Sequence, residues 1–141
     1  MLLACAIAPA SRLLLAGLLV LTLTPAWSRP ELHCDLEVNG EAHHHVFPMV
    51  SNPYTVTSID IGERFRFKAV VLGEGDHVDL VNIYAYYQTR RQPMLMQHAK
   101  HISPIAQDNP LPDALTGRVA LYSPVLGKEL AYRCALHRRA P

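Results

Sequence analysis

Hydrophobic and polar residues alternate along several short segments of this chain, with glycine, proline and asparagine between the segments. The clearest segment is 64–71, where the odd-numbered residues are apolar and the even-numbered residues include three cations. A period of two is typical of a β-strand with one buried face. No window after residue 28 sustains a helical period, so the pattern predicts an all-β domain.

We expect a small antiparallel β-sandwich of about seven to eight strands, because strand-like segments follow one another at short intervals. The candidate strands are residues 32–38, 44–50, 54–61, 64–71, 78–87, 94–101, 118–122 and 129–137. Residues 102–115, which include three prolines, form the longest expected loop. Loops of that length are either functional or without fixed structure, and the sequence favours neither reading.

The strands 64–71 and 78–87 are expected to pair as a hairpin around the glycine-rich turn between them. Closing the chain there places Phe65 opposite Tyr84 and aligns the apolar faces of the two strands, with Asn82 as the exception. Since a slip by one residue would turn one apolar face outward, this agreement favours both the hairpin and its register.

Two cysteines define the expected closure of the domain. Cys34 and Cys134 lie in the first and last strands, on the apolar face of each. An even pair in an oxidising compartment predicts a disulfide. The chain-entropy estimate for a loop of about 100 residues is roughly 4 to 5 kcal/mol. Free thiols that bind a metal or catalyse redox chemistry usually lie close together in sequence, which these do not.

The segment Tyr132-Arg133-Cys134 bears on the topology. Its Tyr-x-Cys spacing resembles the tyrosine corner of immunoglobulin-like domains. The resemblance implies an immunoglobulin-like Greek key as one form of the sandwich, with the bridge joining the terminal strands. After residue 28 the chain has no tryptophan that could pack against that bridge.

An apolar segment near the start of the chain predicts export. Residues 13–23 are almost entirely apolar but too few to span a bilayer as a helix. The small residues Ala26 and Ser28 suit a signal peptidase. We therefore expect a cleavable secretory signal peptide over residues 1–28 and a single domain over residues 29–141, not embedded in a membrane after cleavage. A lipidation-like box also occurs, but it precedes the apolar segment and so cannot follow an export signal.

Charge argues against one class of partner. Without Arg12, which falls in the expected signal peptide, twelve Lys and Arg residues balance twelve Asp and Glu residues. The basic clusters are Arg64/Arg66/Lys68, Arg90-Arg91 and Arg138-Arg139. These form no basic stripe for phosphate contacts, so we expect no nucleic-acid partner. The chain has no Asn-x-Ser/Thr sequence, which favours a bacterial periplasm and leaves an extracellular location open.

Two groups of side chains could bind a metal, because all eight histidines follow residue 28. The first group is Met94, Met96, His98 and, just beyond, His101. Alternation along the strand would place the two thioethers and the first imidazole on one face. Thioethers together with imidazole suit copper, Cu(I) above all. The alternative is that both methionines fill the core.

The second group is His43-His44-His45, which follows the hairpin sequence Asn39-Gly40. A two-residue turn there sets His44 opposite Asp35 with His33 diagonal to it, so that imidazoles and a carboxylate come within reach of one another. The same register places the other two histidines on the core face, where unpaired imidazoles are costly, and this conflict counts against it. Neighbouring histidines of a strand also point to opposite faces, so the triplet is not one three-ligand set.

Catalytic motifs are missing from the sequence: it contains no nucleophile elbow, no zinc-protease motif, no phosphate-binding loop and no Cys-x-x-Cys. We therefore favour an exported, non-catalytic binding or accessory domain that engages another envelope protein or a ligand. Tyr84, Tyr86 and Tyr87 offer an aromatic surface for such contacts, although Tyr84 is expected in the core. The alternative is a periplasmic copper-binding protein that uses the methionines and histidines above, and a small hydrolase has the least support.

Overall fold

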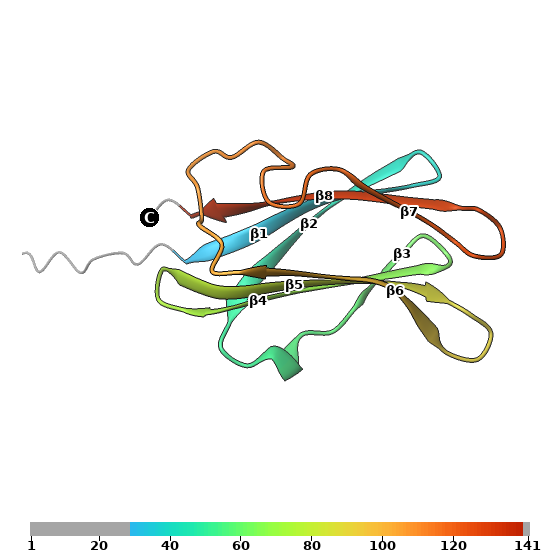
Figure 1. Cartoon of the computed structure of the whole chain (residues 1–141), viewed down its shortest axis with the longest axis horizontal. Coiled ribbons are helices and arrows are strands. Elements are labelled where there is room, and N and C mark those ends of the chain that lie inside the picture. Colours follow the sequence, from blue (N-terminus) through green and yellow to red (C-terminus); the bar gives the residue numbers. More distant parts are fainter. Residues whose placement is uncertain (1–28, 140–141) are drawn as a thin grey trace, which may run out of the picture.

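A computed structural model describes residues 29–139 (Figure 1), and the expected signal peptide lies outside the described residues. The strands are β1 (Pro30–Val38), β2 (Glu41–Val50), β3 (Ile59–Ile61), β4 (Phe65–Glu74), β5 (His77–Gln88), β6 (Pro93–Ile102), β7 (Val119–Tyr122) and β8 (Glu129–Arg138), with a short 3-10 helix η1 (Pro53–Thr55). The prediction of an all-β domain is confirmed. Between residues 29 and 139, no helix has the length and apolar character needed to cross a membrane.

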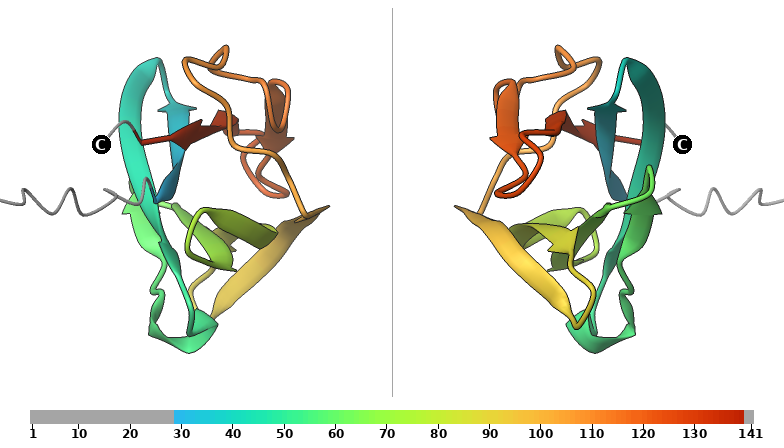
Figure 2. Two further views of the ribbon diagram at one scale, coloured as in Figure 1. Left: turned by 90° about the vertical axis from the view of Figure 1, so that its left-hand side faces the viewer. Right: turned by 90° about the vertical axis from the view of Figure 1, so that its right-hand side faces the viewer.

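The strands form one mixed sheet in the order β6-β5-β4-β2-β1-β8-β7, with β3 paired to β4. Viewed end-on, the sheet curls into a nearly closed barrel (Figure 2). Neighbouring strands are antiparallel except β2 and β4, which run parallel where Met49 faces Val71. The expected sandwich of antiparallel strands is corrected accordingly. The last residues of β2 leave β1 and pair with β4, so both halves belong to one sheet. The immunoglobulin-like arrangement is not confirmed.

The core lies on the inner face of this sheet. On β1 and β8 the residues predicted to point inward are all buried: Leu32, Cys34, Leu36, Val38, Leu130, Tyr132, Cys134 and Leu136. On β4, Phe67 is fully buried and packs edge to face against Tyr132, with ring centroids 5.2 Å apart. The inward faces assigned to these three strands are therefore confirmed.

The hairpin of β4 and β5 forms, but its turn is tighter than expected. β4 continues to Glu74, which pairs with His77, and a bulge between Leu72 and Gly73 interrupts the register. The bulge requires glycine, because a β-carbon on Gly73 would collide with the carbonyl oxygen of His77. The strand therefore ends three residues later than its alternation of apolar residues suggests.

Because of this bulge and turn, most of β5 turns toward the core the face that the predicted register had placed outside. Phe65 pairs with Tyr87, and the predicted pairing of Phe65 with Tyr84 is wrong. Ile83 and Tyr87 are buried, whereas Tyr84 lies on the outer face. Asn82, the one mismatch in the expected register, is also an outer-face residue. The sequence is ambiguous here because β5 carries large apolar side chains on both faces.

The expected strand at 54–61 is wrong over most of its length. Asn52 and Pro53 start a turn instead, in which the backbone N–H of Tyr54 donates to Asn52 Oδ1 at 3.0 Å. Pro53 then opens η1, where its missing N–H costs nothing. Only the last three residues of the segment form a strand, β3, which pairs with β4.

The long loop after β6 has a defined path along β8. The Gln107 N–H donates to the Leu136 carbonyl at 3.0 Å, and the Arg138 N–H donates to the Gln107 carbonyl at 2.8 Å. Nearer β7, Thr116 Oγ1 accepts a hydrogen bond from the Cys134 N–H at 2.8 Å. The loop therefore runs beside the part of β8 that lies beyond the first residue of β7, with one isolated bridge between Gln107 and His137.

Candidate functional site

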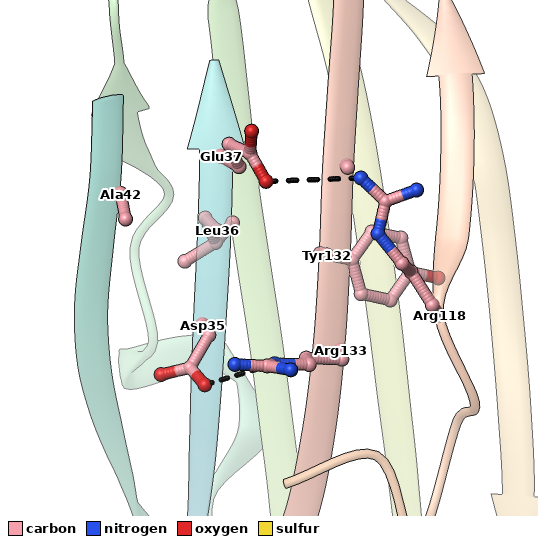
Figure 3. A pocket seen from close by; sticks show the side chains of 8 residues that line it. Asp35, Leu36, Glu37, Ala42, Arg118, Tyr132 and Arg133 are labelled. Atoms are coloured by element: carbon pink, nitrogen blue, oxygen red, sulfur yellow. Dashed lines mark hydrogen bonds and ion pairs between the residues drawn. The ribbon is translucent and has the colours of Figure 1, made fainter. Parts of the chain in front are cut away.

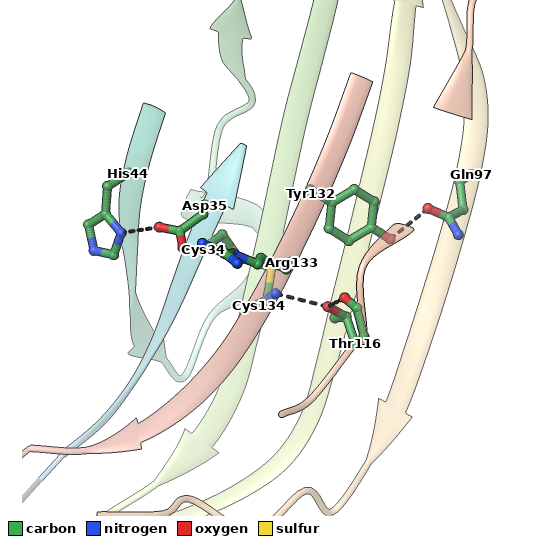
Figure 4. The surroundings of a disulfide bond; sticks show 9 residues. Cys34, Asp35, His44, Gln97, Thr116, Tyr132, Arg133 and Cys134 are labelled. Atoms are coloured by element: carbon green, nitrogen blue, oxygen red, sulfur yellow. Dashed lines mark hydrogen bonds and ion pairs between the residues drawn. A yellow bond between two sulfur atoms is a disulfide. The ribbon is translucent and has the colours of Figure 1, made fainter. Parts of the chain in front are cut away.

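The predicted disulfide joins Cys34 of β1 to Cys134 of β8, and Figure 4 shows its surroundings. The two residues are direct partners in the sheet, with a Cα–Cα distance of 4.2 Å and a sequence separation of 100. Both are fully buried. Because thiol–disulfide exchange requires access to a sulfur atom, this bridge is a structural closure.

The tyrosine next to the bridge makes a different contact from a tyrosine corner. In a tyrosine corner the hydroxyl bonds to the backbone a few residues upstream. The Tyr132 hydroxyl instead donates to Gln97 Oε1 of β6 at 2.6 Å (Figure 4). Burial raises the pKa of Tyr132 to about 12, and the bond to Gln97 opposes that rise. The phenol is therefore a neutral donor at physiological pH.

The outer face of β4, β5 and β6 carries aromatic and basic side chains in rows across the three strands. One row is Lys68, Tyr84 and His98, and the next is Arg66, Tyr86 and Leu95. All six side chains are partly or fully exposed, and together they are called the aromatic–basic face below. Tyr84 therefore belongs to the surface, contrary to expectation, while Tyr87 is buried and contributes nothing to it.

The rings of the aromatic–basic face cover one another. Tyr84 and His98 stack with centroids 4.4 Å apart and planes 8° apart. Tyr86 continues the stack from Tyr84 at 6.3 Å and 16°. His98 Nε2 lies 3.0 Å from Asn82 Oδ1, so its N–H donates to that oxygen. Because the ring faces are turned toward each other, ring edges and phenolic hydroxyls remain for a partner to contact.

This face is basic although the domain as a whole is neutral. Arg66 is partly neutralised by Asp60 of β3, whose Oδ1 lies 2.8 Å from the arginine Nε. Further cations lie on or beside the face: Lys68, Lys100, Arg90 and Arg91. Within residues 29–139 these four form no ion pair. The surface therefore presents hydrogen-bond donors and positive charge.

A second cluster lies on the outer face of β2, β1 and β8. His44 is opposite Asp35, as the two-residue turn predicts, and its Nδ1–H donates to Asp35 Oδ1 at 2.7 Å (Figure 4). Arg133 of β8 donates from Nε to the other carboxylate oxygen at 3.1 Å. The hydrogen bond from His44 and then Arg133 lower the pKa of Asp35. The predicted proximity of imidazole and carboxylate is confirmed.

Two more imidazoles extend this cluster. The ring of His33 lies 5.4 Å from that of His44 and 4.1 Å from that of His137. Burial lowers the pKa of His33, and the neighbouring His137 and His44 lower it further. The three rings line a cavity of about 170 Å³ with Asp35, Ala135 and two prolines of the long loop. Within residues 29–139, no three His, Cys, Asp or Glu side chains are placed to hold a metal ion.

A neighbouring cavity of about 140 Å³ on the same face is lined by ion pairs (Figure 3). Asp35 lies 3.1 Å from Arg133, and Glu37 lies 3.7 Å from Arg118. In both pairs the opposite charges neutralise each other, and such exposed pairs contribute little energy. The surface around this cavity therefore carries no excess of positive or negative charge, in contrast to the aromatic–basic face.

The methionine group is divided by a bulge. Met96 has no partner on β5, and such an extra residue reverses the alternation of side chains beyond it. Met96 packs against the core, whereas His98 lies on the outer face against Tyr84. Met94 is 40% exposed near the start of β6. The alternation that would unite the two thioethers with His98 is therefore wrong.

The remaining candidate ligands lie apart from these clusters. His43 and His45 are half-buried on the inner face of β2, with ring centroids 6.5 Å apart. Their inward register is tolerated because β2 meets β4 only at its last two residues, which leaves both rings partly exposed. Burial, and then His43, lower the pKa of His45. His101 lies on the inner face of β6, where burial lowers its pKa and its Nε2 has no hydrogen-bond partner.

Two features of these sites are absent from the predictions above. The first is the contact of His137 with His33, although placing Cys34 opposite Cys134 aligns β1 with β8 and brings the two histidines together. The second is the pair of rows of the aromatic–basic face, which depend on the register of β5, and the predicted register of β5 is wrong.

No protein-family model matches this chain, and no curated protein or solved structure matches it. Function is therefore inferred from the side chains described above.

Proposed function

We propose that this chain is an exported, non-catalytic binding domain of the cell envelope that holds a partner protein on the aromatic–basic face. The observation that carries this proposal is the pair of rows across β4, β5 and β6, centred on Tyr84 and Tyr86. Tyrosine and arginine are enriched in protein interfaces and supply much of their binding energy. The stacked rings support one another, which reduces the conformational entropy lost on binding.

The charge of this face indicates an acidic contact surface on the partner. Lys68, Lys100 and the two arginines of the β5–β6 connection have no ion-pair partner within the described residues. Complementary charge steers association and sets its specificity. A single-stranded nucleic acid fits less well, because its bases need open ring faces for stacking. In the Tyr84–His98 stack those faces are turned toward each other.

A non-catalytic role is favoured by the surroundings of the imidazole cluster. The His44–Asp35 pair has the geometry of a general base with an orienting carboxylate. The cavity beside it is lined by histidines, prolines, an alanine and that aspartate, with no hydroxyl or thiol. The exported location rests on the expected signal peptide and on the disulfide, which is typical of oxidising compartments. The bacterial periplasm is the preferred compartment.

Site-specific photo-crosslinking in the producing cell tests this function. A photoreactive residue at Tyr86 is expected to give a discrete adduct, and Lys68→Glu is expected to abolish it. The matched control is the same residue at Tyr122, which is 60% exposed on β7, away from the face. Equal adducts from both positions, or an adduct at Tyr86 that Lys68→Glu leaves intact, would contradict the proposal.

A further inference from the structure

The two ends of the sheet differ in how the chain covers them. β1 pairs with one edge of β8, and β7 pairs with the first residues of its other edge. Farther along that second edge, Thr116 and Gln107 of the long loop form hydrogen bonds with the backbone of β8. β6 ends the strand order on the other side and has β5 as its sole strand neighbour within residues 29–139. The outer backbone groups of β6 are therefore left without a strand partner.

Natural edge strands carry features that prevent another strand from pairing with them, and only part of β6 has such features. Pro93 and the bulge at Met96 disrupt the first half, and both features block the addition of another strand. From Gln97 to Ile102 the pairing with β5 is regular, without a further bulge. Six consecutive residues thus offer an edge without a bulge, on which Lys100 is the single lysine.

The two faces of this edge differ in chemistry. On the inner face Ala99 lies between Gln97 and His101. Ala99 is only partly buried against the core, as are Val119 and Leu121 of β7 on the opposite side of the opening. His98 and Lys100 are on the outer face, next to the aromatic–basic face. Alternate side chains of an added strand would therefore meet the apolar surface of Ala99, Val119 and Leu121, and the others would meet the positive charge of Lys100.

We propose that residues 97–102 of β6 bind an extended segment of the partner protein by strand addition, and that this segment alternates apolar with acidic side chains. Main-chain hydrogen bonds would supply affinity, and the alternating side chains would supply specificity. The inference rests on the proposed binding function and names the form of the partner. The added strand lies beside the aromatic–basic face, so the rest of the partner reaches Tyr84 and Tyr86.

The test uses purified exported protein and an acetylated octapeptide that alternates glutamate and valine. The peptide is expected to bind and to protect backbone amides of residues 97–102 from hydrogen exchange. The same peptide with alternate amides N-methylated should not bind, because those amides cannot donate backbone hydrogen bonds to β6. Lys100→Glu should weaken binding by about tenfold, since charge complementarity is lost. Lys128→Glu, in the connection of β7 and β8, is the matched control and should leave binding unchanged.

Four outcomes would overturn the inference. If a lysine–valine peptide binds equally well, the edge does not select acidic side chains. If the N-methylated peptide binds equally well, the peptide does not bind by strand addition. Protection of residues 97–102 that rises with protein concentration alone, with dimers in sedimentation, would make the occupant a second copy of this chain. If the peptide fails but the adduct at Tyr86 persists, strand addition is wrong and the proposed function stands.

Discussion

The Tyr132 hydroxyl donates a hydrogen bond to Gln97 Oε1 at 2.6 Å, and this bond joins β8 to β6 across the side where the barrel is open. The two strands are not neighbours in the sheet, so no backbone ladder connects them. The partly exposed apolar side chains of β6 and β7 border the same opening. The bond therefore holds the two ends of the sheet in place while leaving the outer edge of β6 free.

Removing this bond should measurably loosen the barrel. Tyr132→Phe is expected to cost about 0.5 to 1.5 kcal/mol of unfolding free energy, because the Gln97 oxygen loses its donor. Urea unfolding of Tyr132→Phe, Gln97→Met and the double variant should give a coupling energy of similar size. Tyr54→Phe is the control, since Tyr54 is 93% exposed. Additive effects in the double variant would mean that the bond contributes nothing.

The disulfide should account for a large share of the stability. The variant Cys34→Ala/Cys134→Ala is expected to lose roughly 4 to 5 kcal/mol, as estimated for a loop of about 100 residues. Native exported protein should titrate no free thiol, because both half-cystines are buried in the bridge. Two reactive thiols in that material, or a variant as stable as the parent in urea, would contradict this.

The sequence predicts best where alternation is unambiguous. β1 and β8 are apolar on one face and polar on the other, and a covalent bridge aligns them, so their inward residues follow from the pattern. β5 has large apolar side chains on both faces, so its alternation does not select one. The bulge at Gly73 then decides the register, through a steric fit that sequence does not display.

The candidate sites also differ in how far they can be predicted from the sequence. The His44–Asp35 pair follows from a local turn of two residues, and a local signal suffices to predict it. The aromatic–basic face needs the correct register of three strands, and the methionine group needs an unbroken β6. A bulge changes which side chains share a face. The bulge in β6 has no distinct mark in the sequence, and Gly73, which the bulge in β4 requires, is indistinguishable in sequence from a residue of the turn.

The observed register can be tested on adjacent residues of β5. Ile83→Ala should cost about 2 to 5 kcal/mol, because Ile83 is fully buried. Tyr84→Ala should cost much less, because Tyr84 lies on the outer face. On β4, Phe67→Ala and Arg66→Ala form the same contrast, with about 3 to 5 kcal/mol for the ring and little for the exposed cation. Urea unfolding measures all four, and a larger loss for Tyr84→Ala would restore the other register.

Stability should fall as the solution is acidified from about pH 7.5 to 5. Burial lowers the pKa of His33, His45 and His101 below the ordinary 6.5, so the unfolded chain binds protons more readily than the folded chain does. The loss begins near the unfolded value and continues down to the lowered folded values. Asp35 affects stability at lower pH. Its pKa in the folded chain is lowered below the ordinary 3.8, so the stability that its carboxylate contributes is lost as the pH falls through that lowered pKa.

His101 gives the sharpest test of this pH dependence. His101→Leu removes a half-buried imidazole whose buried Nε2 has no hydrogen-bond partner, so the variant should lose less stability than the parent between pH 7.5 and 5. His77→Gln is the control, because His77 is exposed at the β4–β5 turn. Thermal unfolding at the two pH values measures the difference. A pH dependence unchanged by His101→Leu would show that this residue titrates alike in the folded and unfolded chains.

Copper binding at the methionine group is the remaining prediction, and the bulge in β6 decides its expected outcome. A Cu(I) site there needs the thioethers of Met94 and Met96 to converge with the His98 imidazole. Met96 packs against the core and His98 stacks on Tyr84 outside the barrel, so the three are not gathered on one face. Titration of reduced protein with Cu(I) against a competing chelator should therefore give the same weak affinity for the parent and for Met94→Leu/Met96→Leu. The swap conserves volume and should leave the fold intact, which unfolding in urea checks. Tight binding in the parent that the double variant loses would restore the copper-binding alternative.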